Sequence, residues 1–161
     1  MQFEILIDKK ENPRQCTIHP LKDRSDFSIR YFGKRKAIPA FTSEVLLHVD
    51  GDSLNELSQK KPVASIGLID CTWKKVPSAL ARLEAPLPRL VRIPEGFLTA
   101  YPRRNKEGKD PLEGLATIEA LFIAAAFFGN WDESLLKHYH FKDDFLKINK
   151  LQWERYGISA K

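Results

Sequence analysis

The residues best suited to chemistry stand together in the segment SIGLIDCTWKK, residues 65–75, where an acid, a thiol and a tryptophan follow an apolar run. An acid at the end of a strand, directly before a helix, often lines a ligand crevice in α/β folds. Asp70 has that position, but the same spacing also suits a helix N-cap. Trp73 suits a core as well as a ligand wall. Cys71 has no paired histidine nearby and is more typical of a small buried residue than of a nucleophile.

The other reactive residues do not form the patterns of common metal or nucleotide sites. Two cysteines, Cys16 and Cys71, are too few for a disulfide framework or a four-cysteine zinc site, and they suit a reducing compartment. The four histidines are scattered, at His19, His48, His138 and His140. The sequence contains neither an H-E-x-x-H motif nor a glycine-rich phosphate loop. It therefore predicts no metal centre and disfavours a nucleoside triphosphate or an ordinary dinucleotide as ligand.

Positive charge is concentrated in two segments that could contact a polyanion. The chain carries a formal net charge of +5, which suits nucleic acid without requiring it. In the first segment basic side chains alternate with aromatic ones, a pattern that can follow a nucleic-acid backbone and stack bases. The alternatives are a strand edge protected by charge and a solvated loop. The residues expected to contact RNA are Arg30, Lys34, Arg35, Lys36, Arg103 and Arg104.

The order of apolar patterns predicts an α/β half followed by a helical half. Strands are predicted at residues 3–7, 27–32, 44–49, 62–70 and 88–93, and helices at 53–61, 73–83, 115–128, 133–138 and 144–156. The fourth strand is apolar at both alternate positions, as expected of a central parallel strand covered on both faces. Strands alternating with helices, followed by helices alone, predict two domains, residues 1–100 and 101–161.

No segment has the pattern of a secretory signal or a membrane span. The N-terminus is a short strand pattern rather than a charged and then apolar leader. The longest apolar run begins at Leu121 and is far shorter than the roughly 20 residues that a transmembrane helix needs. The hydrophobic content of 43% is enough for an ordinary core. We therefore expect a soluble, cytoplasmic protein, and we expect a monomer.

Four segments together resemble one enzyme family. They are NPRQCT (12–17), IGLIDCTW (66–73), LATIEAL (115–121) and FKDDFLKINK (141–150). The family is that of the ribosomal RNA aminocarboxypropyltransferases that modify a pseudouridine in small-subunit RNA. The resemblance implies a SPOUT-like α/β domain with a parallel sheet, a helical C-terminal domain and a deep trefoil knot, which is a rare topology. It also implies S-adenosylmethionine as cofactor, whose 3-amino-3-carboxypropyl group is transferred to N3 of a uridine or modified pseudouridine.

The same resemblance implies roles for individual residues. Trp73 and Val76 would wall the pocket that buries the methyl group of the cofactor, and Asp70 would serve as base or positioning group for the N3 proton. Ile69 would accept from the ribose hydroxyls through its carbonyl oxygen, and Thr17 would hold the carboxylate of the transferred group. The other contacts expected with the cofactor, to its adenine and to the same carboxylate, involve Ile38, Pro39, Ile93, Leu112 and Ala116.

The segment between the fifth predicted strand and residue 115 departs from the family pattern, because it is longer and more basic and lacks the family's Asn-Pro motif. The RNA target, ribosomal or transfer RNA, is therefore left open. Two alternatives fit the same sequence: a SPOUT-type RNA methyltransferase that moves the methyl group instead, and a non-catalytic basic protein that binds RNA or assists ribosome assembly. Thr17, Asp70 and Trp73 favour a transferase, since a protein that only binds RNA has no need of all three.

Overall fold

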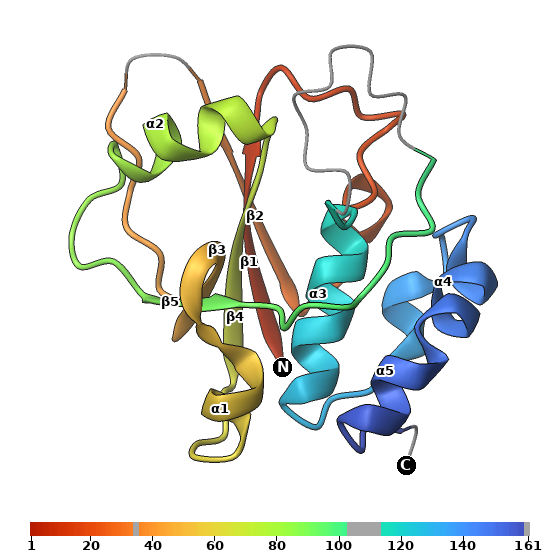
Figure 1. The fold of residues 1–161 in the computed structure, drawn as a ribbon. Helices are drawn as coiled ribbons and strands as arrows, with labels where there is room; N and C mark the ends of the chain where they lie inside the picture. Colours follow the sequence, from red (N-terminus) through yellow and green to blue (C-terminus); the bar gives the residue numbers. More distant parts are fainter. Residues whose placement is uncertain (34–35, 103–113, 160–161) are drawn as a thin grey trace.

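A five-stranded parallel sheet forms the centre of the computed structural model, which describes residues 1–33, 36–102 and 114–159 (Figure 1). The strands are β1 (Gln2–Asp8), β2 (Phe27–Phe32), β3 (Val45–Ser53), β4 (Ser65–Asp70) and β5 (Arg89–Arg92). Their spatial order is β2-β1-β4-β3-β5, and every pairing is parallel. The five strands predicted from the sequence are confirmed, and β4 is the central strand, as its apolar pattern predicted.

Helices cover the sheet and make up the C-terminal half (Figure 1). In the first part of the chain they are the 3-10 helices η1 (His19–Leu21) and η2 (Trp73–Lys75), with α1 (Leu54–Ser58) and α2 (Val76–Leu80). The second part contains α3 (Thr117–Phe127), the 3-10 helix η3 (Glu133–Leu136), α4 (Lys142–Ile148) and α5 (Lys150–Arg155). The predicted alternation of strands and helices, followed by helices alone, is confirmed.

Several predicted helices are shorter in the structure than the sequence pattern suggested; α1, for example, ends at Ser58 and not at residue 61, and two others are interrupted by contacts that can be identified. The helix expected at 73–83 stops at Leu80, because the segment after it pairs with Ile38, which donates to the carbonyl oxygen of Arg82 at 2.9 Å. The helix expected at 144–156 is divided at the buried Asn149. The Asn149 side chain accepts from the backbone N–H of Leu98 at 2.7 Å and donates to its carbonyl oxygen at 2.8 Å. Both interruptions therefore follow from contacts that are distant in the sequence.

Alternate side chains of β1 enter two separate cores on opposite faces of the sheet. Phe3, Ile5 and Ile7 belong to the larger core, which also contains α3, whereas Leu6 belongs to a smaller core with Ala79 of α2. Successive side chains of a strand point to opposite faces, so β1 carries the consecutive apolar residues Ile5, Leu6 and Ile7 because both of its faces are buried. Helices α2 and α3 thus cover opposite faces of the sheet (Figure 1).

Helix α3 is buried on all sides. It lies between the sheet and an aromatic cluster of the C-terminal helices, in which Phe122 packs against Trp131, Phe145 and Trp153 with ring centroids 5.0, 6.2 and 6.0 Å away. A helix that is apolar around its whole circumference has no face to offer to water. The residues of α3 that are completely buried include Leu121, Phe122, Ile123, Ala124 and Ala125.

A buried carboxylate fixes the beginning of α3. Glu119 is fully enclosed and accepts four hydrogen bonds, from the hydroxyls of Thr99 and Tyr139 at 2.7 Å each and from the N–H groups of Ala100 at 2.8 Å and Ala116 at 2.7 Å. A charge taken out of water is tolerated only when such partners replace the water. Glu119 therefore connects the chain that follows β5, the first turn of α3 and the segment after η3.

Arg24 ties the loop before β2 to η3 through two carboxylates. Its guanidinium donates two bonds to Asp26, at 2.9 and 2.8 Å, and one to Asp132 at 3.0 Å, as well as one to the Ser134 hydroxyl at 2.7 Å. The Arg24 bond is the main cause that holds the pKa of Asp26 below its ordinary value. Burial alone would raise the pKa of Asp132, but the bonds from Ser134 and Arg24 outweigh it, so this pKa is lowered as well.

We expect Arg24→Met to destabilise the fold in a pH-dependent way. A carboxylate with a lowered pKa contributes stability above its unfolded value, near 3.8 for Asp26 and Asp132, and loses it as the pH falls through the lower folded value. The variant should unfold about 1 kcal/mol more easily at neutral pH, a modest effect because the groups are partly exposed. Urea unfolding across pH should show this difference shrinking below pH 3.8; a difference independent of pH would contradict the assignment.

Candidate functional site

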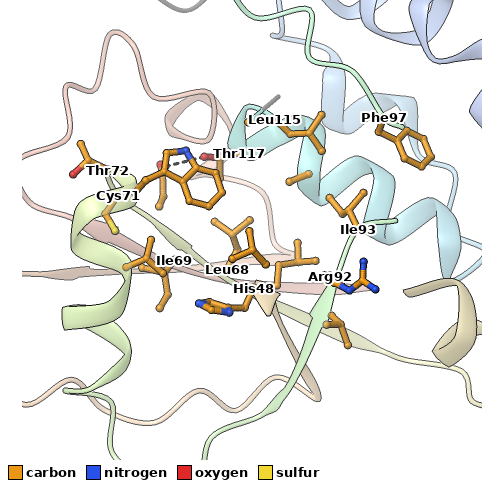
Figure 2. Close-up of a pocket in the computed structure, with 18 of the residues that line it drawn as sticks. His48, Leu68, Ile69, Cys71, Thr72, Arg92, Ile93, Phe97, Leu115 and Thr117 are labelled. Carbon is orange, nitrogen blue, oxygen red and sulfur yellow. Dashed lines mark hydrogen bonds between the residues drawn. The ribbon is translucent and has the colours of Figure 1, made fainter. Parts of the chain in front are cut away.

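A cavity of about 550 Å³ opens at the carboxyl ends of β3, β4 and β5. Figure 2 shows Ile69 and Thr72 on one side, Ile93 and Phe97 on the opposite side, and Thr117 of α3 between them at the rim. Ligands of open parallel sheets bind outside the carboxyl ends of the strands, and pockets for small organic ligands have volumes of roughly 300–1,000 Å³. The cavity therefore has the place and the size of a cofactor site.

Asp70 is the last residue of β4 and lines this cavity. Its two carboxylate oxygens accept from the Thr117 hydroxyl at 2.8 Å and from the Cys16 thiol at 3.1 Å. The interpretation of Asp70 as a helix N-cap is wrong, because Thr72 is the residue before η2 and no side chain caps that helix. Asp70 instead connects the segment after β1, the central strand and the start of α3.

Three acidic groups near Asp70 have raised pKa values. Burial, followed by the charge of Asp70, raises the pKa of the Cys16 thiol to about 12. Burial, followed by the charges of Asp8 and Asp70, raises the pKa of Cys71 to about 12. The pKa of Glu11 is raised as well, first by burial and then by Asp70. Both thiols are therefore poor nucleophiles at neutral pH, and Cys16 serves Asp70 as a hydrogen-bond donor.

Apolar side chains predicted to enclose a cofactor do lie together at the cavity. Ile69 comes from β4, Trp73 begins η2, Val76 begins α2, and Ile93 follows β5; all four line the cavity with Asp70. Because η2 and α2 follow β4 after a short turn, the tryptophan and the valine are folded back beside the end of their own strand.

Thr17 is placed at the start of α3 rather than on the cavity lining. Its hydroxyl oxygen accepts from the backbone N–H of Ile118 at 3.2 Å, which leaves the hydroxyl proton able to donate. Ala116 was expected to offer its backbone N–H to a ligand, but this group donates to Glu119 at 2.7 Å. Of the two groups predicted to hold a carboxylate, only Thr17 therefore retains a donor in this structure.

Ile38 and Pro39 were predicted to contact adenine, but the structure does not bring them to the cavity. Ile38 is buried in the smaller core and forms a bridge with Leu83. The carbonyl oxygen of Pro39 accepts from Arg30. The cavity is lined instead by residues 47–49 of β3, which were not predicted to contribute. Leu112, the remaining predicted contact, lies outside the described residues.

The cavity residues that the sequence did not indicate come from β3, from β5 and the segment after it, and from the start of α3. Leu47, His48 and Val49 line it from β3, and Arg92 lines it from β5 (Figure 2). The Nδ1 atom of His48 accepts from the N–H of Asp50 at 3.2 Å, so its Nε2 atom carries the proton when the ring is neutral. The one available signal was the position of these residues at strand ends, where open α/β sheets bind ligands.

The residues predicted to contact RNA have different surroundings. Arg30 is engaged within the fold: its guanidinium donates to Glu4 at 2.7 Å and to the carbonyl oxygens of Pro39 and Ala40 at 3.1 Å each. Lys36 is exposed. The other predicted RNA contacts lie outside the described residues; they are Lys34, Arg35, Arg103 and Arg104.

Two kinds of feature are absent from the described part of the chain. Within residues 1–33, 36–102 and 114–159, no group of three or more His, Cys, Asp or Glu side chains is arranged to hold a metal ion. Over the same ranges, no helix has both the length and the apolar character needed to span a membrane.

The comparisons with known proteins give one structural match. No protein-family model and no curated protein sequence matches the chain. Among solved structures, the match is to the structure described as that of the SAM-dependent rRNA:acp-transferase Tsr3 from Vulcanisaeta distributa, with a TM-score of 0.67 and 20% sequence identity. The superposition covers 96% of this chain and 82% of that one. The α/β architecture and the resemblance stated from the sequence are thus confirmed at the level of structure: the chain has the fold of the SAM-dependent rRNA:acp-transferase Tsr3.

Proposed function

We propose that this protein transfers the 3-amino-3-carboxypropyl group of S-adenosylmethionine to N3 of a uridine or modified pseudouridine in RNA, with small-subunit ribosomal RNA as the expected substrate. The observation that carries the proposal is the placement of Asp70 and Trp73 in one cavity at the carboxyl end of the sheet. The matched structure is described as that of a SAM-dependent rRNA:acp-transferase, which supports the proposal. The deep trefoil knot and the two domains, 1–100 and 101–161, belong to the same proposal.

The cavity has the chemistry that S-adenosylmethionine requires. Its apolar walls suit the adenine ring and the methyl group, and the carboxylates of Glu11, Asp70 and Glu95 at its lining suit a positively charged sulfonium. We propose Trp73 and Val76 as the wall around the methyl group and the carbonyl of Ile69 as the acceptor for the ribose hydroxyls. When bound, the cofactor would supply electrophilic carbons next to its sulfonium.

The adenine and carboxylate contacts differ from those first expected. We propose that adenine lies between the ends of β3 and β5, against Leu47 and Ile93, since both line the cavity. Thr17 is the proposed donor to the carboxylate of the transferred group, because its hydroxyl proton is available beside the first turn of α3.

Asp70 is the proposed proton acceptor. Two neutral donors, the thiol of Cys16 and the hydroxyl of Thr117, hold its carboxylate in one orientation. Neither donor carries a charge, so neither forms an ion pair with the carboxylate. Orientation by the enzyme decides which carbon next to a sulfonium meets the nucleophile, and Trp73 would bury the methyl group while Asp70 positions N3 in front of the aminocarboxypropyl chain.

We expect Thr117→Val to lower the rate constant of transfer, kcat, about tenfold or more, because Asp70 loses the donor that orients one of its oxygens. The affinity for the cofactor should change little, since valine has the shape of threonine. Thr117→Ser, which keeps the hydroxyl, is the matched control and should recover most of the rate. Equal rates for the valine and serine variants would contradict a role of the hydroxyl in holding Asp70.

The decisive experiment uses S-adenosylmethionine labelled either in the methyl group or in the carboxyl carbon. Each preparation is incubated with the protein and with total RNA from a strain that lacks the gene. Entry of the carboxyl label alone supports the proposal, and digestion of the RNA then identifies the base. Entry of the methyl label alone would make the protein a methyltransferase. Entry of neither label into RNA, together with no binding of the cofactor, would favour a non-catalytic RNA-binding protein.

A further inference from the structure

A second hollow, of about 470 Å³, lies on the other side of the η2–α2 segment from the cofactor cavity. It is bounded by the ends of β1 and β2 and by α2. Trp73 and Val76 line the cavity, while Lys75 and Ser78 line the hollow, and among the described residues the two linings have no member in common. The hollow is therefore separate from the proposed transfer site but shares a wall with it.

The charged side chains of this hollow are four cations and one carboxylate, Lys9, Lys10, Lys75, Arg82 and Asp8. Lys75 forms an ion pair with Asp8. Burial alone would raise the pKa of Asp8, but its hydrogen bonds to Lys75 and to the Lys10 backbone lower it overall, so the carboxylate stays charged at neutral pH. Asp8 thus neutralises Lys75 and leaves the charges of the three other cations uncompensated.

Arg82 gives the hollow a fixed shape without losing its charge. Its guanidinium donates to the carbonyl oxygen of Gly33 at 2.7 Å and to that of Ser78 at 3.1 Å, and it lies over the Phe32 ring at 5.5 Å. These partners are uncharged, so the positive charge remains available to a ligand. Within the described ranges, Lys9 and Lys10 have no ion pair, and both are exposed at the rim.

We propose that this hollow binds a backbone phosphate of the substrate RNA, next to the nucleotide whose base enters the cofactor cavity. The inference rests on the proposed function, because that function supplies an RNA chain at the neighbouring cavity. Lysine and arginine side chains with a hydroxyl nearby, here Ser78, are the groups that bind phosphate oxygens. Because only the short η2–α2 segment separates the two sites, an RNA chain that crosses this segment contacts both of them.

The test compares two pairs of adjacent lysines. Lys9→Gln with Lys10→Gln removes two charges from the hollow. Lys60→Gln with Lys61→Gln removes two charges from an exposed segment before β4, at the opposite end of the parallel sheet, and is the matched control. Fluorescence anisotropy with a labelled RNA stem-loop gives the affinity of each variant as a function of salt. Titration with S-adenosylmethionine checks that the cofactor cavity is intact in both.

The Lys9/Lys10 variant is expected to bind the RNA roughly tenfold more weakly than the wild type. In a plot of the logarithm of the binding constant against the logarithm of the salt concentration, its slope should be shallower by about 0.7–0.9 for each phosphate that it no longer neutralises. Its affinity for S-adenosylmethionine should be unchanged. The control should keep its RNA affinity within about twofold of the wild type, because the charges it removes line neither of the two sites. An equal reduction of RNA affinity in the two variants, or no reduction in either, would overturn the proposal.

A second readout separates a bound RNA phosphate from a free phosphate ion. Amide NMR shifts of Gly33 and Ser78 are followed during titration with the stem-loop and with inorganic phosphate. Shifts caused by the RNA support the proposal, whereas shifts caused by phosphate but not by RNA overturn it. Transfer by the wild type is measured in a separate assay that uses the carboxyl label. If RNA binding depends on Lys9 and Lys10 but no label enters the RNA, the proposed activity is rejected and the phosphate site is not.

Discussion

Replacing Asp70 by asparagine is expected to lower the rate of aminocarboxypropyl transfer by about 10²–10⁴-fold, the usual contribution of a positioned proton acceptor. The amide has nearly the shape of the carboxylate and can still accept from the Thr117 hydroxyl, so the fold and the cavity should persist. It cannot take up the N3 proton at neutral pH. Single-turnover transfer of the carboxyl label, with RNA and protein in excess over cofactor, measures this step directly.

The matched control for this variant is Asp144→Asn, the same change on the exposed side of α4. It should transfer at the rate of the wild type. Cofactor affinity, measured by calorimetry, should be similar in both variants. Wild-type rates in Asp70→Asn would remove Asp70 from the mechanism. Loss of cofactor binding in the same variant would show that Asp70 acts by shaping the cavity and not by accepting a proton.

Glu119→Ala is expected to destabilise the protein by at least about 3 kcal/mol, the largest stability effect that the structure indicates. The substitution removes the carboxylate that accepts from four donors, of which Ala116 N–H and the Tyr139 hydroxyl are buried. Taking the acceptor from a buried donor costs about 1–3 kcal/mol, and partial entry of water reduces the sum. Urea unfolding monitored by tryptophan fluorescence measures the change in the free energy of unfolding.

Two further variants make this result specific. Glu154→Ala removes an exposed carboxylate that pairs with Lys150 at 3.8 Å and should change the stability by less than about 0.5 kcal/mol. Glu119→Gln keeps one acceptor oxygen and should lie between the alanine variant and the wild type. A Glu119→Ala protein within about 1 kcal/mol of the wild type would contradict the view that this carboxylate holds the first turn of α3.

The strands and the main helix could be predicted because their signals are local. A strand that is buried on both faces carries consecutive apolar residues, as β1 does at residues 5–7 and β4 at Leu68 and Ile69, and a buried helix is apolar on almost every side, as α3 is apart from Glu119. The breaks at Leu80 and Asn149 were missed because each depends on a partner elsewhere in the chain, Ile38 for the first and Leu98 for the second.

The candidate site was predictable only where one segment supplies it. Ile69, Asp70, Trp73 and Val76 lie within eight residues of sequence, and all of them line the cavity. The hydrogen bonds that Asp70 makes join residues 54 and 47 positions away in the chain, and no local pattern contains them. The wall from β3 was missed for the same reason, since it depends on the lateral order of strands β4-β3-β5 in the sheet.

The enclosure of α3 has a consequence for how the chain is made. All five strands precede α3 in the chain, and translation proceeds from the N-terminus. Until α3 emerges, the sheet face formed by residues such as Phe3, Ile5 and Ile66 has no cover, and it offers an apolar surface to other nascent chains. The N-terminal part of the nascent chain therefore cannot complete the larger core until α3 has been made.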